Sequence, residues 1–122
     1  RKDQTITPLQ ALTLLNNVTF VESARHLAER MLKFKGKQSP RDRIAYGFRS
    51  ITGRRPVKEE LNLLLADLKV HLETFSLNPE SAKNFLKVGQ RPNDPKLSSE
   101  QVAAYALVAS TIMNLDEAIT LN

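Results

Sequence analysis

The sequence contains 122 residues, of which 41% are hydrophobic and 25% charged, as is typical of one globular domain with its own core. It contains no cysteine, which excludes disulfides, zinc–thiolate sites, iron–sulfur clusters and covalent haem attachment within these residues. The net charge of +5 is uneven, because residues 1–58 carry thirteen Lys and Arg against four Asp and Glu, whereas residues 59–122 carry five against nine. This asymmetry fits a basic surface that attracts an acidic partner, and it also fits two halves of opposite charge that pack together.

The first element is an uncharged segment, TITPLQALTLLNN, over residues 5–17. Thr7 suits the N-cap of a helix, Pro8 suits its first position, and Gln10 lies where a capping box needs a polar side chain. Three leucines follow at the spacing of helical turns: Leu9, Leu12 and Leu15. The segment contains too many Thr, Gln and Asn residues to span a bilayer. We therefore predict a buried helix.

Two further helices are predicted before residue 54. The first covers about residues 19–34, with an apolar stripe of Val21, Ala24, Leu27, Ala28, Met31 and Leu32. Its polar residues are expected to face outward: Glu22, Arg25, Glu29, Arg30 and Lys33. The second begins at Ser39-Pro40, a cap residue followed by proline, and stops at Gly53. Its inward positions are Ile44, Ala45, Phe48 and Ile51.

The rest of the chain predicts three more helices. The longest covers about residues 57–77, with a core face of Leu61, Leu64, Leu65, Leu68, Leu72 and Phe75. Asn78-Pro79 begins a short helix that is expected to end at Gly89, and Ser98 or Ser99 caps a last helix, with Ser98 and Gln101 as a capping box. The core positions of this last helix are Val102, Tyr105, Ala106, Ala109, Ile112 and Met113. The sequence therefore predicts an all-α fold, a single-domain helical bundle of about five to six helices over residues 1–122.

The sequence offers few groups for catalysis or metal binding. Glu22 and His26 are four residues apart, as are Asp67 and His71, so each pair could supply two ligands from one face of a helix. Transition-metal sites use three or more protein ligands, so we interpret both histidines as structural. The sequence has no phosphate-binding glycine loop and no GxSxG motif. We therefore predict a protein that is not an enzyme, with no catalytic residue, no metal ligand and no cofactor.

One segment, RDRIAYGFRSITGRRP, concentrates positive charge and suggests polyanion binding. Its arginines are Arg41, Arg43, Arg49, Arg54 and Arg55, with Tyr46 and Phe48 between them. Guanidinium groups bind phosphate well and aromatic rings can stack on bases. However, Phe48 lies at the spacing of a core stripe, and the next helix is leucine-rich and begins with Glu59-Glu60. Binding of nucleic acid or another polyanion is therefore the alternative interpretation, not the preferred one.

Four segments carry a resemblance to a known family: TPLQALTLLNN, FVESARHLAERML, RIAYGFRSITGRRPVKEEL and AAYALVASTIMNLDEAIT. In this order they resemble the planctomycete-type C-terminal domain of unknown function, which occurs in large secreted proteins that also carry a planctomycete cytochrome c domain. The residue after the GRxP turn in that family is often Thr, a good cap, whereas this chain has Val57. The resemblance implies an extracytoplasmic setting and association with a haem protein outside these residues, and it supplies no catalytic residue.

These observations together favour a helical, non-catalytic accessory or interaction module. We expect residues 1–122 to be the C-terminal part of a larger protein, with other domains of that protein or a separate protein as the partner. We also expect exposed apolar surface that such a partner covers, most plausibly near residues 5–17. Leu9, Leu12 and Leu15 are the candidate contacts there.

Overall fold

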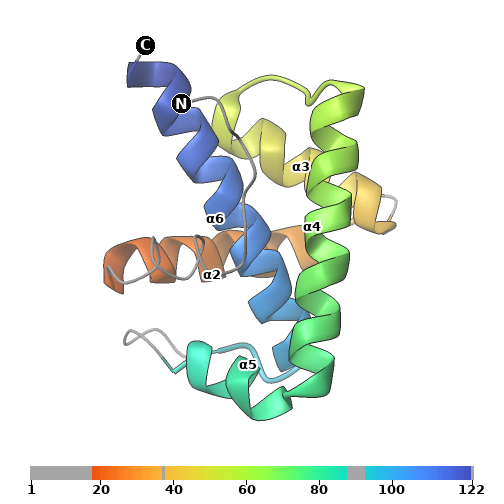
Figure 1. The fold of residues 1–122 in the computed structure, drawn as a ribbon, viewed down its shortest axis with the longest axis vertical. Coiled ribbons are helices and arrows are strands. Elements are labelled where there is room, and N and C mark those ends of the chain that lie inside the picture. The colour runs from red at the N-terminus through yellow and green to blue at the C-terminus, as the bar shows by residue number, and fades with distance from the viewer. Residues whose placement is uncertain (1–17, 37, 88–92, 122) are drawn as a thin grey trace.

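The computed structural model describes residues 18–36, 38–87 and 93–121. Within these ranges the chain forms five helices and no strand: α2 (Val18–Leu32), α3 (Pro40–Thr52), α4 (Lys58–Leu77), α5 (Pro79–Phe85) and α6 (Ser99–Leu121). Figure 1 shows α6 running through the middle of the bundle, with α4 along one side and α5 at one end. The predicted all-α, single-domain fold is therefore confirmed. The predicted helix at residues 5–17, with Leu9, Leu12 and Leu15, lies outside the described residues.

Helix α6 is the centre of the hydrophobic core. Every residue from Val102 to Ile112 is buried, because the helix packs against α2, α3, α4 and α5. The predicted core positions are buried except Met113, which is partly buried. The sequence pattern indicated one apolar face, whereas the structure buries the helix all round, as expected for a run with apolar residues on every side. None of the helices in the described ranges is long and apolar enough to cross a lipid bilayer.

The predicted start and end of α3 are confirmed. The Ser39 hydroxyl oxygen accepts a hydrogen bond from the Asp42 backbone N–H at 3.1 Å, and Pro40 is the first helical residue. At the other end, Gly53 has φ 80° and donates its N–H to the Arg49 carbonyl at 2.9 Å. A left-handed residue at this position favours glycine, which is why the helix ends there.

Helix α5 ends earlier than predicted. Its last residue is Phe85 and its C-cap is Leu86, whereas the sequence placed the end at Gly89, which lies outside the described residues. The Asn93 side chain donates a hydrogen bond to the Leu86 carbonyl at 3.1 Å. A carbonyl at the end of the helix is thus satisfied by a side chain from the following loop, a contact that helical periodicity does not encode.

Helix α2 packs its predicted apolar stripe against α6 and α3, and all six stripe residues are buried. The outward orientation predicted for Arg25 is wrong, because this side chain is only 1% exposed. Seven residues separate Arg25 from Leu32 and four separate it from Val21, so at about 100° per residue Arg25 lies on the same face as these two. Its charge suggested a surface position, but its place in the helical repeat put it in the core.

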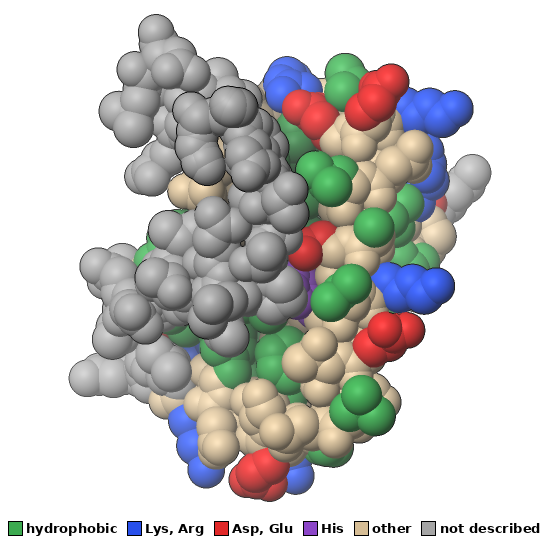
Figure 2. Space-filling model, viewed as in Figure 1, with side chains coloured by type: hydrophobic (Ala, Val, Ile, Leu, Met, Phe, Trp, Pro, Cys, Tyr) green, Lys and Arg blue, Asp and Glu red, His purple; other side chains and the backbone are tan. Residues whose placement is uncertain are grey.

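Helix α4 has apolar side chains on two opposite faces. Its inner face packs on the core through Leu61, Leu64, Leu68, His71 and Phe75. Its outer face carries what we call the outer stripe, which consists of Leu63, Ala66, Val70 and Leu77. The large members of the stripe are 52% exposed at Leu63, 45% at Val70 and 88% at Leu77. Figure 2 shows hydrophobic side chains spaced along this helix among its polar neighbours.

Candidate functional site: an arginine-rimmed cleft

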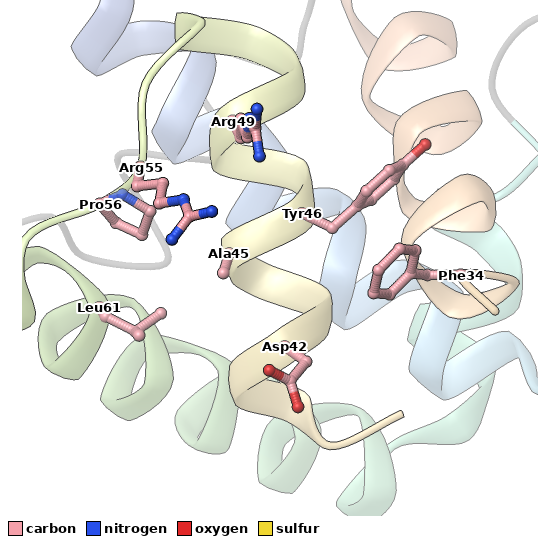
Figure 3. A pocket seen from close by; sticks show the side chains of 8 residues that line it. All are labelled: Phe34, Asp42, Ala45, Tyr46, Arg49, Arg55, Pro56 and Leu61. Carbon is pink, nitrogen blue, oxygen red and sulfur yellow. The ribbon is translucent and has the colours of Figure 1, made fainter. Parts of the chain in front are cut away.

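One candidate site in the described part of the chain is a cleft between α3, the beginning of α4 and the end of α2, with a volume of about 480 Å³. We call it the α3–α4 cleft. Helix α3 supplies four of its residues at helical spacing, and the other four come from the chain on either side; the lining is Phe34, Asp42, Ala45, Tyr46, Arg49, Arg55, Pro56 and Leu61 (Figure 3). The site thus combines an apolar floor with charged groups of both signs.

One wall of the cleft is a fixed aromatic pair. The rings of Phe34 and Tyr46 stack with their centroids 4.6 Å apart and their planes 19° from parallel. The Arg30 guanidinium donates a hydrogen bond to the Tyr46 hydroxyl at 2.8 Å and lies 5.7 Å from the centre of the Tyr46 ring. Stacking and a charged donor together hold the Tyr46 ring in place. A ligand would therefore meet a preformed aromatic surface.

The opposite side of the cleft is the turn between α3 and α4. Arg54 forms a two-pronged ion pair with Glu60, at 3.0 Å and 2.9 Å, and its guanidinium carbon lies 4.9 Å from the centre of the Phe48 ring. The Glu60 carboxylate also accepts the Val57 backbone N–H at 2.9 Å. We call this arrangement the Arg54–Glu60 clamp. It fixes the turn from which the Arg55 side chain extends.

The clamp also explains how α4 begins with Val57 at its N-cap. Valine has no side-chain acceptor for the first turn of the helix. Glu60, three residues later, binds the Val57 N–H and so supplies the second half of a capping box. The Arg54 hydrogen bonds, and to a lesser extent the Val57 N–H, hold the pKa of Glu60 below its ordinary value, against the opposing effect of burial.

The structure separates the five arginines of the basic segment into different environments. Arg43 is half-buried and lies 6.0 Å from the centre of the Tyr105 ring, and Arg54 belongs to the clamp. Arg41, Arg49 and Arg55 are exposed, but only Arg49 and Arg55 line the cleft. The sequence cluster is therefore no uniform basic patch. Two of its members face the cleft, where they can bind a carboxylate or phosphate with paired hydrogen bonds.

Burial gives Tyr105 an unusual environment for a phenol. Its side chain lies in the core at 2% exposure, and this desolvation raises the pKa of Tyr105, although a hydrogen bond with Arg43 opposes the shift. The phenol is therefore neutral at physiological pH. Arg43 and Tyr105 act together as a polar contact inside the bundle, and Arg43 is directed away from the cleft.

The sequence predicts Arg49 and Arg55 as binding residues but not the cleft around them. It predicts Phe34 at the end of a helix and Leu61 in the core, and it indicates no role in a site for Asp42 or Pro56. One signal was present, because Asp42, Ala45, Tyr46 and Arg49 follow the three- and four-residue spacing of a single helical face. The packing of Phe34 and the α3–α4 turn against that face cannot be read from spacing.

The two histidines lie in different surroundings. His26 is exposed, whereas His71 is 1% exposed and its Nε2 atom lies 3.2 Å from Asp67 Oδ2. Asp67 and His71, four residues apart on α4, therefore lie close together on one face of the helix. No group of three or more His, Cys, Asp or Glu side chains comes together in the described part of the chain.

A comparison with protein-family models matches residues 1–68 to PSD1, a protein of unknown function (DUF1553). The chain belongs to this family. The match agrees with the resemblance found in the sequence, although the fourth of the resembling segments, residues 103–120, lies outside it. No curated protein and no solved structure matches the chain.

The PSD1 match includes α2, α3 and the first half of α4, and therefore all eight residues of the α3–α4 cleft. It also includes the Arg54–Glu60 clamp. The PSD1 description assigns no ligand and no residue role. A function for this chain must therefore be argued from the chemistry of the cleft.

Proposed function

We propose that this chain is a non-catalytic helical interaction module that binds a protein segment in the α3–α4 cleft. The observation that carries the proposal is the pairing of two exposed guanidinium groups, Arg49 and Arg55, with the stacked rings of Phe34 and Tyr46 across one cleft. Arginine and tyrosine are enriched at the energetically important positions of protein interfaces. The site is also preformed, which reduces the entropy lost on binding.

The lining indicates a segment with both acidic and apolar residues. A carboxylate can accept two parallel hydrogen bonds from either guanidinium group. An apolar side chain beside it can pack on Ala45, Pro56 and Leu61. Asp42, which also lines the cleft, would repel a continuous run of acidic groups but can accept backbone or side-chain N–H donors of a peptide.

The family resemblance supports a wider setting for this activity. On that basis we place the module in a larger extracytoplasmic protein that carries a cytochrome c domain, with another domain of that protein or a separate protein as the source of the bound segment. The proposed role is non-catalytic, and His71, which contacts Asp67, is 1% exposed, so a substrate cannot reach its ring.

Fluorescence anisotropy tests the proposal with a labelled peptide of alternating glutamate and leucine. We expect Arg49→Ala and Arg55→Ala each to weaken binding about tenfold, because each removes a charge-assisted contact. Arg41→Ala is the matched control, since Arg41 is exposed on the same helix but does not line the cleft. A second peptide, in which serine replaces the leucines, should bind more weakly, because the apolar floor is then unused.

A heparin titration separates this proposal from the alternative of polyanion binding. A polyanion surface responds to total charge, so Arg41→Ala would then weaken heparin binding as much as Arg49→Ala does. Strong salt-dependent heparin binding, together with equal effects of the three arginine variants on both ligands, would overturn the proposal of a peptide-binding cleft.

A further inference from the structure

We propose that the outer stripe of α4 is a homodimer interface that pairs two copies of this chain with their α4 helices antiparallel. The large residues of the stripe, Leu63, Val70 and Leu77, repeat at intervals of seven and lie opposite the core face of the same helix. A seven-residue repeat keeps one seam of a helix facing a partner helix over several turns. A helix exposed to solvent alone would carry polar residues at these positions.

The stripe has the symmetry that two identical copies require. Val70 lies at its midpoint, and Leu63 and Leu77 lie about 10.5 Å on either side at a rise of about 1.5 Å per residue. A two-fold axis at Val70 therefore sets Val70 against its own copy and sets each Leu63 beside Leu77 of the other copy. The same surface then serves both subunits, as in an isologous interface.

The charges beside the stripe favour this arrangement. Lys69 and Glu73 are both exposed, and at about 100° per residue they lie on the same edge of the stripe. A two-fold axis that lies in the interface and is perpendicular to α4 places the Lys69–Glu73 edges of the two copies side by side. The two edges then run in opposite directions. Lys69 of each copy then lies within about 3 Å, measured along the helix axis, of Glu73 of the other. Two reciprocal ion pairs of this kind flank the axis.

The shape of the α4 surface also fits antiparallel pairing of two copies. Leu77 is the most exposed large hydrophobic residue in the described part of the chain, at 88%. At the other end of the stripe lies a hollow of about 190 Å³ with a mostly apolar lining: Leu63, Leu64, Ala66, Asp67, Val70 and Thr111. Antiparallel pairing brings Leu77 of each copy level with this hollow of the other, so a protruding side chain meets a recess.

The expected dimer is weak, since one helix per subunit supplies the whole apolar contact. Interfaces of this size lie at the low end of the range for specific association, so we expect a dissociation constant on the order of 10–100 μM. Single-cysteine cross-linking detects such a dimer, and the 122-residue chain suits this method because it has no cysteine of its own.

The first test uses oxidation of cysteine variants of the whole chain. Val70→Cys should form a disulfide-linked dimer, whereas Lys83→Cys, an exposed control on α5, should not. Leu63→Cys and Leu77→Cys should each stay monomeric alone, because like positions are about 21 Å apart along the axis, and should cross-link when mixed. Circular dichroism checks that each variant is folded. Self-linking of Leu63→Cys as fast as Val70→Cys would overturn the antiparallel pairing.

The second test exchanges the flanking charges and measures the dimer by sedimentation equilibrium. Lys69→Glu or Glu73→Lys alone should raise the dissociation constant about tenfold, because each change places like charges in both ion pairs. The double exchange should restore it to within about threefold of the original. A chain that stays monomeric at millimolar concentration, or a double exchange no better than the single changes, would overturn the proposal.

Discussion

Glu60→Ala should destabilise the domain even in the Arg54→Ala background, although the two residues are partners in one ion pair. Glu60 does two things in the structure, since its carboxylate binds the Arg54 guanidinium and also accepts the Val57 N–H at the start of α4. Loss of Arg54 leaves the second contact in place, although it also removes the contact of the Arg54 guanidinium with the Phe48 ring and its hydrogen bond to the Arg55 carbonyl. Loss of Glu60 removes both, and it also removes a negative charge from the first turn of the helix.

The expected magnitudes follow from these contacts. The side chains of Arg54 and Glu60 are 45% and 30% exposed, so solvent screens the pair and limits its contribution to about 0.5–1 kcal/mol. The capping hydrogen bond and the charge in the first turn add about 0.5–1 kcal/mol. Glu60→Ala should therefore lower the free energy of unfolding by about 1–2 kcal/mol. This corresponds to a fall in Tm of roughly 4–8 °C for a domain of this size.

The effect of Glu60 depends on pH in a defined direction. Its pKa in the folded state is lowered, chiefly by the Arg54 hydrogen bonds, so the folded state binds a proton there less readily than the unfolded state. The stabilisation is complete above the ordinary glutamate pKa of about 4.3 and is lost as the pH falls through the lower pKa of the folded state. The stability difference between the wild type and Glu60→Gln should therefore shrink on acidification.

Urea unfolding followed by circular dichroism measures these differences at pH 7 and at several values below pH 5. The double variant Arg54→Ala/Glu60→Ala completes a cycle, and its loss should be smaller than the summed losses of the single variants by about 0.5–1 kcal/mol. In the Arg54→Ala background, Glu60→Ala should still cost about 0.5–1 kcal/mol at pH 7, and no further loss there would refute a separate capping role for Glu60. A difference between wild type and Glu60→Gln that does not change with pH would refute the assigned pKa direction.

Three further predictions concern the core and the α3–α4 turn, all measured by urea unfolding. Phe48→Ala should cost about 3–5 kcal/mol, because this ring is 1% exposed and the cavity left cannot fill by collapse alone; a loss below 1 kcal/mol would contradict the packing described. Gly53→Ala should cost about 1 kcal/mol although nothing lies within 4 Å of the added Cβ, because φ is +80°, and Gly53→Asn should cost less. His71→Ala should cost about 2–4 kcal/mol, since its ring is buried in the inner face of α4, and an unchanged stability would place that ring outside the core.

Local signals in the sequence determined the features that could be predicted best. The start of α3 at Ser39-Pro40 and its end at Gly53 depend on residues within a few positions of each other, so the chain itself carries the information. The complete burial of α6 depends on how many helices surround it, whereas Arg25 lies beside the predicted apolar stripe of α2 and only its charge suggested a surface position. Periodicity can identify one apolar face, but it cannot tell whether a second helix covers the other face.

The candidate site also depends on packing that the sequence pattern does not show. Five arginines close together in the sequence suggested one binding surface, yet the helical turn directs Arg43 toward Tyr105 and the Glu60 carboxylate draws Arg54 into the clamp. What remains at the cleft is Arg49 and Arg55, and the binding role proposed for them depends on the wall that Phe34 and Tyr46 form there. Charge density along a sequence therefore overestimates a basic surface whenever acidic or aromatic residues lie within reach. Arg54, which the Arg54–Glu60 clamp removes from the basic surface, still contributes to the site, because it fixes the turn from which Arg55 extends into the cleft.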